Sequence, residues 1–293
     1  MSILGDVQGN NLTGTLTSEL ALLTELKQFA AINDDISGSL PDKLGDLTEV
    51  THFILSNNSM SGKIPGDFLQ DSPLEVFMVS DNKFKGEIPE SLTTKSTLYQ
   101  LFLDSNRLSG SIPKEFGSLP NLSTLDLTEN QLSGEIPDEI YSGSIQNLYL
   151  GGSTNIKGTL SSAVGQAVNL VRLHITGTRM SGGIPDELFA LPFLTELVLS
   201  NNTLTGELSE SVADLGGTLR VLKLDGNKFS GNLPNVAIDE LFISNILTFD
   251  RNSFTGAISP TTCRRKGLGH NNLQIITVDC NEVTCSCCNN CEE

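Results

Sequence analysis

Short stretches in which apolar and other residues alternate recur along almost the whole chain. They follow an L-x-x-L-x-L-x-x-N pattern, formed in one case by Leu98, Leu101, Leu103 and Asn106. Alternation with a period of two is typical of a short strand with one buried face. Each stretch therefore predicts one strand, and the asparagine that follows it is expected to bond the backbone of the loop leaving that strand.

A glycine in the next segment, N-x-L-S-G-x-I-P, sets the period of the repeat. Its steps are 24 residues eight times running and then 25 residues twice, at Gly14, Gly38, Gly62, Gly86, Gly110, Gly134, Gly158, Gly182, Gly206, Gly231 and Gly256. Repeats of this length stack into a solenoid, in which each repeat buries its apolar face against its neighbours. We expect about 11–12 repeats of 24–25 residues. Their strands should form a parallel sheet on the concave face, with short helical or 3-10 turns on the convex face.

Three details refine this prediction. Asp34 and Thr178 stand where the pattern calls for asparagine, which predicts weaker contacts in those repeats. The acidic residues after Ile-Pro, as in Pro137-Asp138-Glu139, favour the start of a helix, with proline in its first turn. Between residues 148 and 158 the pattern is one residue too long, which predicts a local bulge.

Residues 10–260 resemble the plant-specific leucine-rich repeats of receptor-kinase ectodomains and polygalacturonase-inhibiting proteins. The segments that carry this resemblance include NRLSGSIPKEF (106–116) and NQLSGEIPDEI (130–140). It implies a leucine-rich-repeat solenoid of the α/β class that binds a partner and is not an enzyme. The ending DCNEVTCSCCNNC (279–291) is more similar to leucine-rich-repeat proteins of diatoms and related algae. We expect a solenoid over 1–260 and a cysteine-rich cap, with a last strand, over 261–293.

Charge and hydropathy narrow the classes of partner. The net charge of −17 disfavours nucleic acid and anionic membranes. No apolar run approaches the roughly 18 residues of a membrane-spanning helix, and the start lacks the features of a secretion signal. The repeat type and the cysteines nevertheless predict an extracellular or cell-surface protein. We therefore expect missing upstream sequence; the alternatives are association at the N-terminal edge of the sheet or a frayed first repeat of low stability.

The six cysteines are confined to the C-terminal end, at Cys263, Cys280, Cys285, Cys287, Cys288 and Cys291. An even number predicts three disulfides, for which 15 pairings exist. The alternative is a zinc site, but C-x-C-C-x-x-C is not the usual zinc spacing, so we expect no metal and no cofactor. Candidate N-glycosylation sites lie at Asn11, Asn57, Asn121 and Asn201.

Candidate binding residues are the outward positions of the predicted strands. Neighbouring strands place equivalent residues in rows, about 4.8 Å apart. In the first half these rows expose an apolar patch of Ile54, Val76, Met78 and Phe102, followed by Asp126. In the second half they are mixed and charged, with Arg172, His174 and Glu196.

No motif for catalysis or phosphate binding accompanies these residues. The sequence therefore favours a recognition module that binds a protein, a peptide or a glycan on its concave or lateral face. The alternative is a structural component of a cell wall, an extracellular matrix or a larger assembly.

Overall fold

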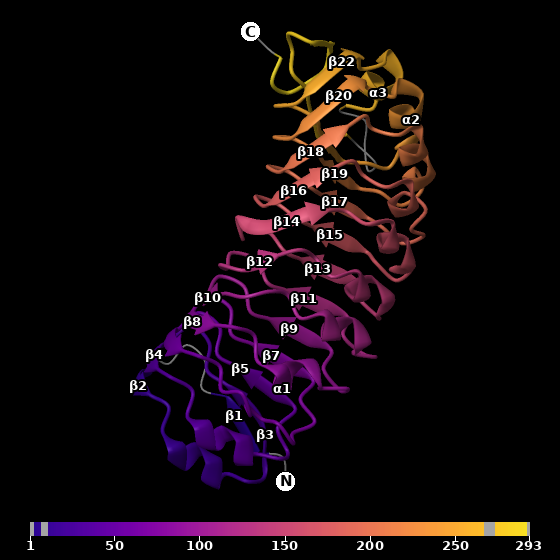
Figure 1. The fold of residues 1–293 in the computed structure, drawn as a ribbon. Coiled ribbons are helices and arrows are strands. Elements are labelled where there is room, and N and C mark those ends of the chain that lie inside the picture. Colours follow the sequence, from indigo (N-terminus) through magenta and orange to yellow (C-terminus); the bar gives the residue numbers. More distant parts are fainter. Residues whose placement is uncertain (1–2, 7–10, 267–272, 292–293) are drawn as a thin grey trace. The chain divides into compact units, whose positions relative to one another are not determined.

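The computed structural model describes residues 3–6, 11–266 and 273–291. The chain divides into two compact units, Met1–Ile145 and Gln146–Glu293, which are described separately. Both consist of stacked parallel strands connected by short helical turns (Figure 1). This arrangement confirms the predicted leucine-rich-repeat solenoid. The expected division into 1–260 and 261–293 stays a prediction.

The first unit contains two parallel sheets. Its first sheet has the order β1 (Ile3–Asp6), β3 (Leu26–Ala30), β5 (His52–Ile54), β7 (Val76–Met78), β9 (Gln100–Phe102) and β11 (Thr124–Asp126). Its second sheet contains β2 (Thr13–Thr15), β4 (Asp35–Gly38), β6 (Ser59–Gly62), β8 (Lys83–Gly86) and β10 (Arg107–Leu108), and the short strand β12 (Ser133–Gly134) follows. The helical turns are η1 (Ser18–Leu22), η2 (Asp42–Asp46), α1 (Glu90–Thr93), η3 (Lys114–Ser118) and η4 (Asp138–Ser142).

The second unit repeats this plan. Its first sheet has the order β13 (Asn147–Tyr149), β15 (Arg172–His174), β17 (Glu196–Val198), β19 (Val221–Lys223), β21 (Ile246–Thr248) and β23 (Ile275–Thr277). Its second sheet has the order β14 (Asn155–Thr159), β16 (Arg179–Gly182), β18 (Thr203–Gly206), β20 (Lys228–Asn232), β22 (Ser253–Ala257) and β24 (Val283–Thr284). The helical turns are η5 (Ser162–Gln166), η6 (Asp186–Leu188), η7 (Glu210–Leu215), α2 (Asn235–Glu240) and α3 (Pro260–Arg264).

The core of each unit is enclosed by its two sheets and its helical turns, because all three contribute fully buried side chains. The inward residues of the odd-numbered strands are fully buried, as at Leu101, Leu125 and Leu173. The outward residues of these strands lie on the side opposite the core, and we call this surface the open face. It carries the outward strand positions that were expected from the sequence.

The predicted asparagines bond the backbone between repeats. The amide nitrogen of Asn106 donates to the carbonyls of Val79, Leu103 and Asp104 at 2.9, 3.2 and 3.0 Å. Its oxygen accepts from the amide of Phe84 at 2.9 Å. Asn58, Asn82, Asn130, Asn202, Asn227 and Asn252 make equivalent bonds. These side chains satisfy backbone groups that would otherwise be buried without partners.

Asp34 cannot complete the same set of bonds. One carboxylate oxygen accepts from the amide of Leu12 at 2.9 Å, but the other is buried without a hydrogen-bond partner. At Thr178 the hydroxyl bonds the side chain of Asn202 in the next repeat. Asn10, which occupies the asparagine position one repeat before Asp34, lies outside the described residues.

Two local predictions need correction. The proline of an Ile-Pro segment lies one position before the helix that follows it, as Pro137 does before η4, because its extended ψ angle excludes it from the helical turn. The extra residue of the irregular repeat lies in the turn around Gly151 and Gly152 and does not make a bulge, because β13 pairs with β15 without a register shift.

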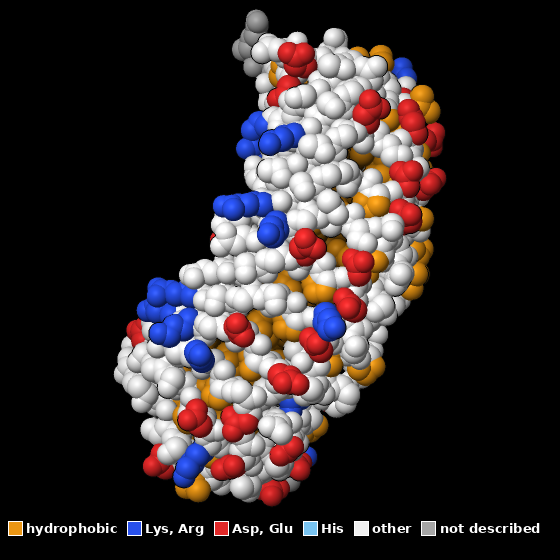
Figure 2. Space-filling view, viewed as in Figure 1, with side chains coloured by type: hydrophobic (Ala, Val, Ile, Leu, Met, Phe, Trp, Pro, Cys, Tyr) orange, Lys and Arg blue, Asp and Glu red, His pale blue; other side chains and the backbone are white. Residues whose placement is uncertain are grey.

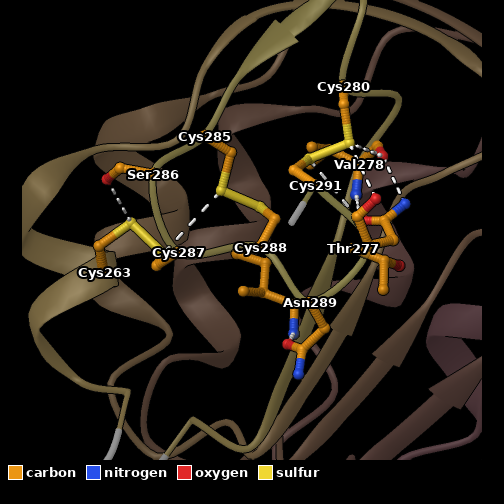
Figure 3. Close-up of a disulfide and its surroundings, with 12 residues drawn as sticks. Cys263, Thr277, Val278, Cys280, Cys285, Ser286, Cys287, Cys288, Asn289 and Cys291 are labelled. Atoms are coloured by element: carbon orange, nitrogen blue, oxygen red, sulfur yellow. Dashed lines mark hydrogen bonds between the residues drawn. A yellow bond between two sulfur atoms is a disulfide. The ribbon is translucent and has the colours of Figure 1, made fainter. Parts of the chain in front are cut away.

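All six cysteines are paired in the second unit, as Figure 3 shows. The disulfides are Cys263–Cys287, Cys280–Cys291 and Cys285–Cys288. The sulfur atoms of Cys263, Cys285 and Cys287 lie within 4.8 Å of one another. Since each belongs to a disulfide, none is available as a thiolate ligand. Cys263–Cys287 joins α3 to the segment after β24, and Cys280–Cys291 joins that segment to the turn after β23.

Candidate functional site

The open face of the first unit carries a row of three apolar side chains. Ile54 on β5 is the register partner of Met78 on β7, which is the partner of Phe102 on β9. All three are half-buried, and hydrophobic side chains form a band over these strands in Figure 2. Asp126 on β11 is the next partner in the row. We call Ile54, Met78 and Phe102 the apolar row.

A groove of about 490 Å³ borders the apolar row at the start of the same strands. It is lined by His52, Glu75, Val76, Thr97, Tyr99, Gln100 and Asn121. Val76 was expected in the exposed patch, and this is wrong: it is only 7% exposed, because it lies between its register partners His52 and Gln100. Tyr99, which the strand pattern did not single out, is 48% exposed and supplies the aromatic wall.

A polar row borders the other side of the apolar row. The hydroxyl of Ser80 donates to Asp104 at 2.5 Å, and the backbone amide of Thr128 donates to Asp126 at 2.9 Å. Burial raises the pKa of both Asp104 and Asp126. The site of the first unit therefore combines an apolar strip with acceptors on one side and a groove on the other.

The open face of the second unit holds the charged cluster expected from the sequence. Glu196 accepts from Arg172 Nε at 3.0 Å and lies 3.0 Å from Nε2 of His174. Tyr149 packs edge-on against His174 with ring centroids 4.9 Å apart. Burial lowers the pKa of His174, although Glu196 acts in the opposite direction. These contacts hold the four side chains together.

A second polar cluster lies further along this face, around a hollow of about 370 Å³. Asp225 accepts from Ser200 at 2.7 Å, Thr248 at 2.6 Å and Arg251 at 2.6 Å. Burial alone would raise the pKa of Asp225, but these hydrogen bonds and the arginine charge lower it. Arg251 also contacts Asp250 at 3.4 Å, so the two carboxylates share one cation. The sequence pattern did not predict this role for Arg251, since it lies in a turn.

The four candidate glycosylation sites, Asn11, Asn57, Asn121 and Asn201, are all exposed. Asn121 lines the groove, and its side chain donates to the carbonyl of Ser96 at 2.7 Å. A sugar on Asn121 would therefore obstruct the groove.

No helix within the described ranges is long and apolar enough to cross a membrane. The Leucine Rich Repeat family profile matches residues 97–119, 121–142 and 193–215. Comparison with curated proteins gives no match.

Three solved structures are informative. One is the ectodomain of the Arabidopsis thaliana receptor kinase GASSHO1/SCHENGEN3, solved with CASPARIAN STRIP INTEGRITY FACTOR 2. Its sequence is 32% identical to this chain, and the match covers 93% of this chain and 32% of the ectodomain, with a TM-score of 0.85. The plant peptide hormone receptor RGFR1, solved with RGF2, is 26% identical over 94% of this chain and 46% of its own, with a TM-score of 0.78. A plant ice-binding protein is 26% identical over 86% of this chain and 80% of its own, with a TM-score of 0.74.

The chain thus spans about a third to a half of the length of these receptor ectodomains. By its repeats, its fold and its structural neighbours, the chain is a leucine-rich-repeat protein of the plant type.

Proposed function

We propose that the chain is an extracellular recognition module that binds an extended peptide on the open face of its first unit. The observation that carries this proposal is the apolar row of Ile54, Met78 and Phe102 on three adjacent strands. Water disfavours a continuous apolar strip unless a partner covers it. RGFR1 is a plant peptide hormone receptor solved with RGF2, and the similar Arabidopsis receptor kinase HAESA was solved with the peptide hormone IDA, which supports the same class of partner.

The surroundings of the apolar row favour a peptide over a glycan. Ile54 and Met78 offer aliphatic surface, which suits the apolar side chains of a peptide. Asp104 and Asp126 border the row and can accept hydrogen bonds from backbone amides or a basic side chain of the ligand. The groove beside Tyr99 has room for one larger side chain. Phe102 is the expected anchor, because buried aromatic residues contribute most at such interfaces.

The test is a matched pair of substitutions. Phe102→Ala removes the anchor, whereas Phe193→Ala removes a 58% exposed phenylalanine of the second unit that lies outside its first sheet. Peptides selected from a displayed random library by the unmodified protein serve as the probe. We expect Phe102→Ala to weaken binding by about 1–3 kcal/mol while stability hardly changes, because the side chain points away from the core.

Phe193→Ala should bind the selected peptides as the unmodified protein does. Equal affinities of all three proteins would reject this site. If no peptide is selected and the chain instead self-associates in an ordered way, the alternative of a structural component would be favoured.

A further inference from the structure

We propose that Cys285 is a redox-active site, which exchanges disulfides with a low-molecular-weight thiol such as glutathione and passes the exchange on to Cys287 and Cys263. The site lies in the cysteine-rich end of the second unit and does not depend on the peptide proposal. Two disulfides form it, Cys285–Cys288 and Cys263–Cys287. Figure 3 shows their sulfur atoms close together, and the sulfurs of Cys285 and Cys287 are 3.9 Å apart.

The two sulfurs of the Cys285–Cys288 pair differ in their access to solvent. Cys285 is half-buried, whereas Cys288 is only 2% exposed. Disulfide exchange begins when a thiolate attacks one sulfur of a pair and releases the other, and access decides which sulfur is attacked. An external thiol therefore attacks Cys285 and releases the thiolate of Cys288. The C-x-x-C spacing of these two cysteines is also that of thioredoxin-like redox motifs.

The Cys285–Cys288 pair contributes little to the stability of the fold. Its cysteines are 3 residues apart in the sequence, compared with 24 for Cys263–Cys287 and 11 for Cys280–Cys291. A disulfide stabilises a protein mainly by restricting the unfolded chain, and a short loop restricts it least. By loop closure alone, a disulfide across 24 residues favours the folded state about twentyfold more than one across 3 residues. The Cys285–Cys288 pair is therefore the one that can open and close while the protein stays folded.

A released Cys285 thiolate lies next to the second disulfide. From its distance of 3.9 Å to the sulfur of Cys287, a movement of about half an ångström brings it within the roughly 3–3.5 Å at which reacting atoms meet. The sulfurs of Cys263, Cys285 and Cys287 all lie within 4.8 Å of one another, and those of Cys280 and Cys291 are not part of this group within the described ranges. The geometry therefore directs the attack of Cys285 to the Cys263–Cys287 bond.

Two neighbouring groups favour Cys263 as the sulfur that leaves. The hydroxyl of Ser286 donates to Sγ of Cys263 at 3.7 Å, and such a bond stabilises the thiolate that forms. Lys266 follows Cys263 by three residues, and its ammonium group donates to the carbonyl of Cys287 at 2.6 Å. This contact places a positive charge beside the same disulfide, and positive charge stabilises a thiolate. A more stable leaving thiolate speeds the exchange.

The exchange conserves atoms and electrons. A first external thiolate forms a mixed disulfide with Cys285, and the Cys285–Cys288 bond breaks. A second external thiolate attacks the sulfur of the bound small thiol, so that a small-molecule disulfide leaves and Cys285 becomes a thiolate. This thiolate forms a bond to Cys287, and Cys263 leaves as a thiolate. Two external thiols are thus oxidised to one disulfide, and the protein gains two thiols, at Cys263 and Cys288, which take up the two protons.

The exchange disconnects α3 from the segment after β24. Cys263 lies in α3, and its bond to Cys287 is the disulfide that links the two. The hydroxyl of Thr262 still donates to Asp239 on α2, so α3 keeps its place in the fold. Cys280–Cys291 stays closed and holds the end of the segment. The site therefore loosens this end of the chain locally in response to thiols.

The experiment compares two variants that each leave one cysteine of the same disulfide unpaired. Cys288→Ser frees Cys285, the reactive residue, whereas Cys285→Ser frees Cys288. Both lose the same disulfide, so their thermal midpoints should agree, and any difference in labelling reflects the position of the free sulfur. The unmodified protein and Cys285→Ser are also treated with glutathione. Each sample is quenched in acid and unfolded, its free thiols are labelled with N-ethylmaleimide, and mass spectrometry without reduction locates the labels and the remaining disulfides.

We expect the label in Cys288→Ser to divide between Cys285 and Cys263. Molecules labelled at Cys263 should contain a Cys285–Cys287 disulfide. In Cys285→Ser the label should stay on Cys288, with Cys263–Cys287 intact. Glutathione should release Cys263 at least about tenfold faster in the unmodified protein than in Cys285→Ser, because a thiolate held next to the bond has a much higher effective concentration than the external thiol.

The proposal is overturned if the thiol of Cys288→Ser stays wholly on Cys285, or if both variants carry the label on Cys263 to the same extent. Equal rates of Cys263 release by glutathione in the unmodified protein and in Cys285→Ser would also overturn it, since Cys285 would then have no role. Opening of Cys280–Cys291 before Cys285–Cys288 would contradict the assignment of the labile pair.

Discussion

Asp34 offers a direct test of how the repeats are connected, because it occupies an asparagine position. Its side chain is 8% exposed, and one carboxylate oxygen has no hydrogen-bond partner. At the equivalent position, Asn106 donates to the carbonyls three and two residues before it, Leu103 and Asp104. In Asp34→Asn the new amide nitrogen would meet the carbonyls of Ala31 and Ile32. We therefore expect the substitution to stabilise the protein.

The expected gain follows from the bonds that change. Each new buried hydrogen bond contributes about 1 kcal/mol, and removing a buried acceptor without a partner contributes a similar amount. The bond from the amide of Leu12 is kept, because the asparagine oxygen can accept it. The total is a gain of about 1–3 kcal/mol in the free energy of unfolding.

The assay is urea denaturation of Asp34→Asn beside the reverse substitution, Asn106→Asp. The reverse change removes three donated bonds and turns a carboxylate towards carbonyl oxygens, so it should cost about 2–4 kcal/mol. Asn121→Ala, which removes an exposed amide bonded only to Ser96, serves as the control for a loss at the surface. An unchanged or lower stability of Asp34→Asn would refute the reasoning, and so would an Asn106→Asp variant as stable as the unmodified protein.

Two further predictions concern the second unit. Because burial lowers the pKa of His174 below its ordinary value of 6.5, the unfolded state takes up its proton first and stability falls as the pH drops below about 6.5. His174→Gln should lose less stability between about pH 7 and 5 than the unmodified protein. Identical pH profiles of the two proteins in thermal unfolding would contradict this. The three disulfides should make the unreduced chain about six hydrogens lighter than the reduced chain in mass spectrometry. Reduction should raise the rate of hydrogen exchange first around β22–β24. Free thiols or bound zinc would contradict a disulfide-bonded cap.

The periodic features could be predicted from the sequence, because one physical rule acts on every repeat. Inward leucines such as Leu101 must be buried, and the asparagine after each strand must satisfy the same backbone groups. The repeat glycines have positive φ, as at Gly86 with 85°, which explains why glycine recurs there. The row of Ile54, Met78 and Phe102 also follows from the period, since residues at equivalent positions become register partners.

Features that depend on individual neighbours could not be predicted. Val76 has the alternation of an outward residue, but the longer side chains on both flanking strands bury it. Tyr99 and Arg251 act from positions outside the strand pattern, where nothing in the period fixes the side-chain direction. The disulfide pairs depend on the path of the chain after β23, so cysteine spacing left 15 choices open.

The most direct test of the proposed function uses methionine as an internal probe. Met60 and Met180 are buried, so Met78 is the methionine within the described ranges that lies on the open face. The protein is produced with a photoreactive diazirine analogue of methionine and irradiated with a peptide that it selected from a library. We predict a cross-link between Met78 and the peptide that is lost in Met78→Leu and reduced in Phe102→Ala. A cross-link that persists in Met78→Leu, or one that joins only two copies of the chain, would contradict peptide binding on the open face.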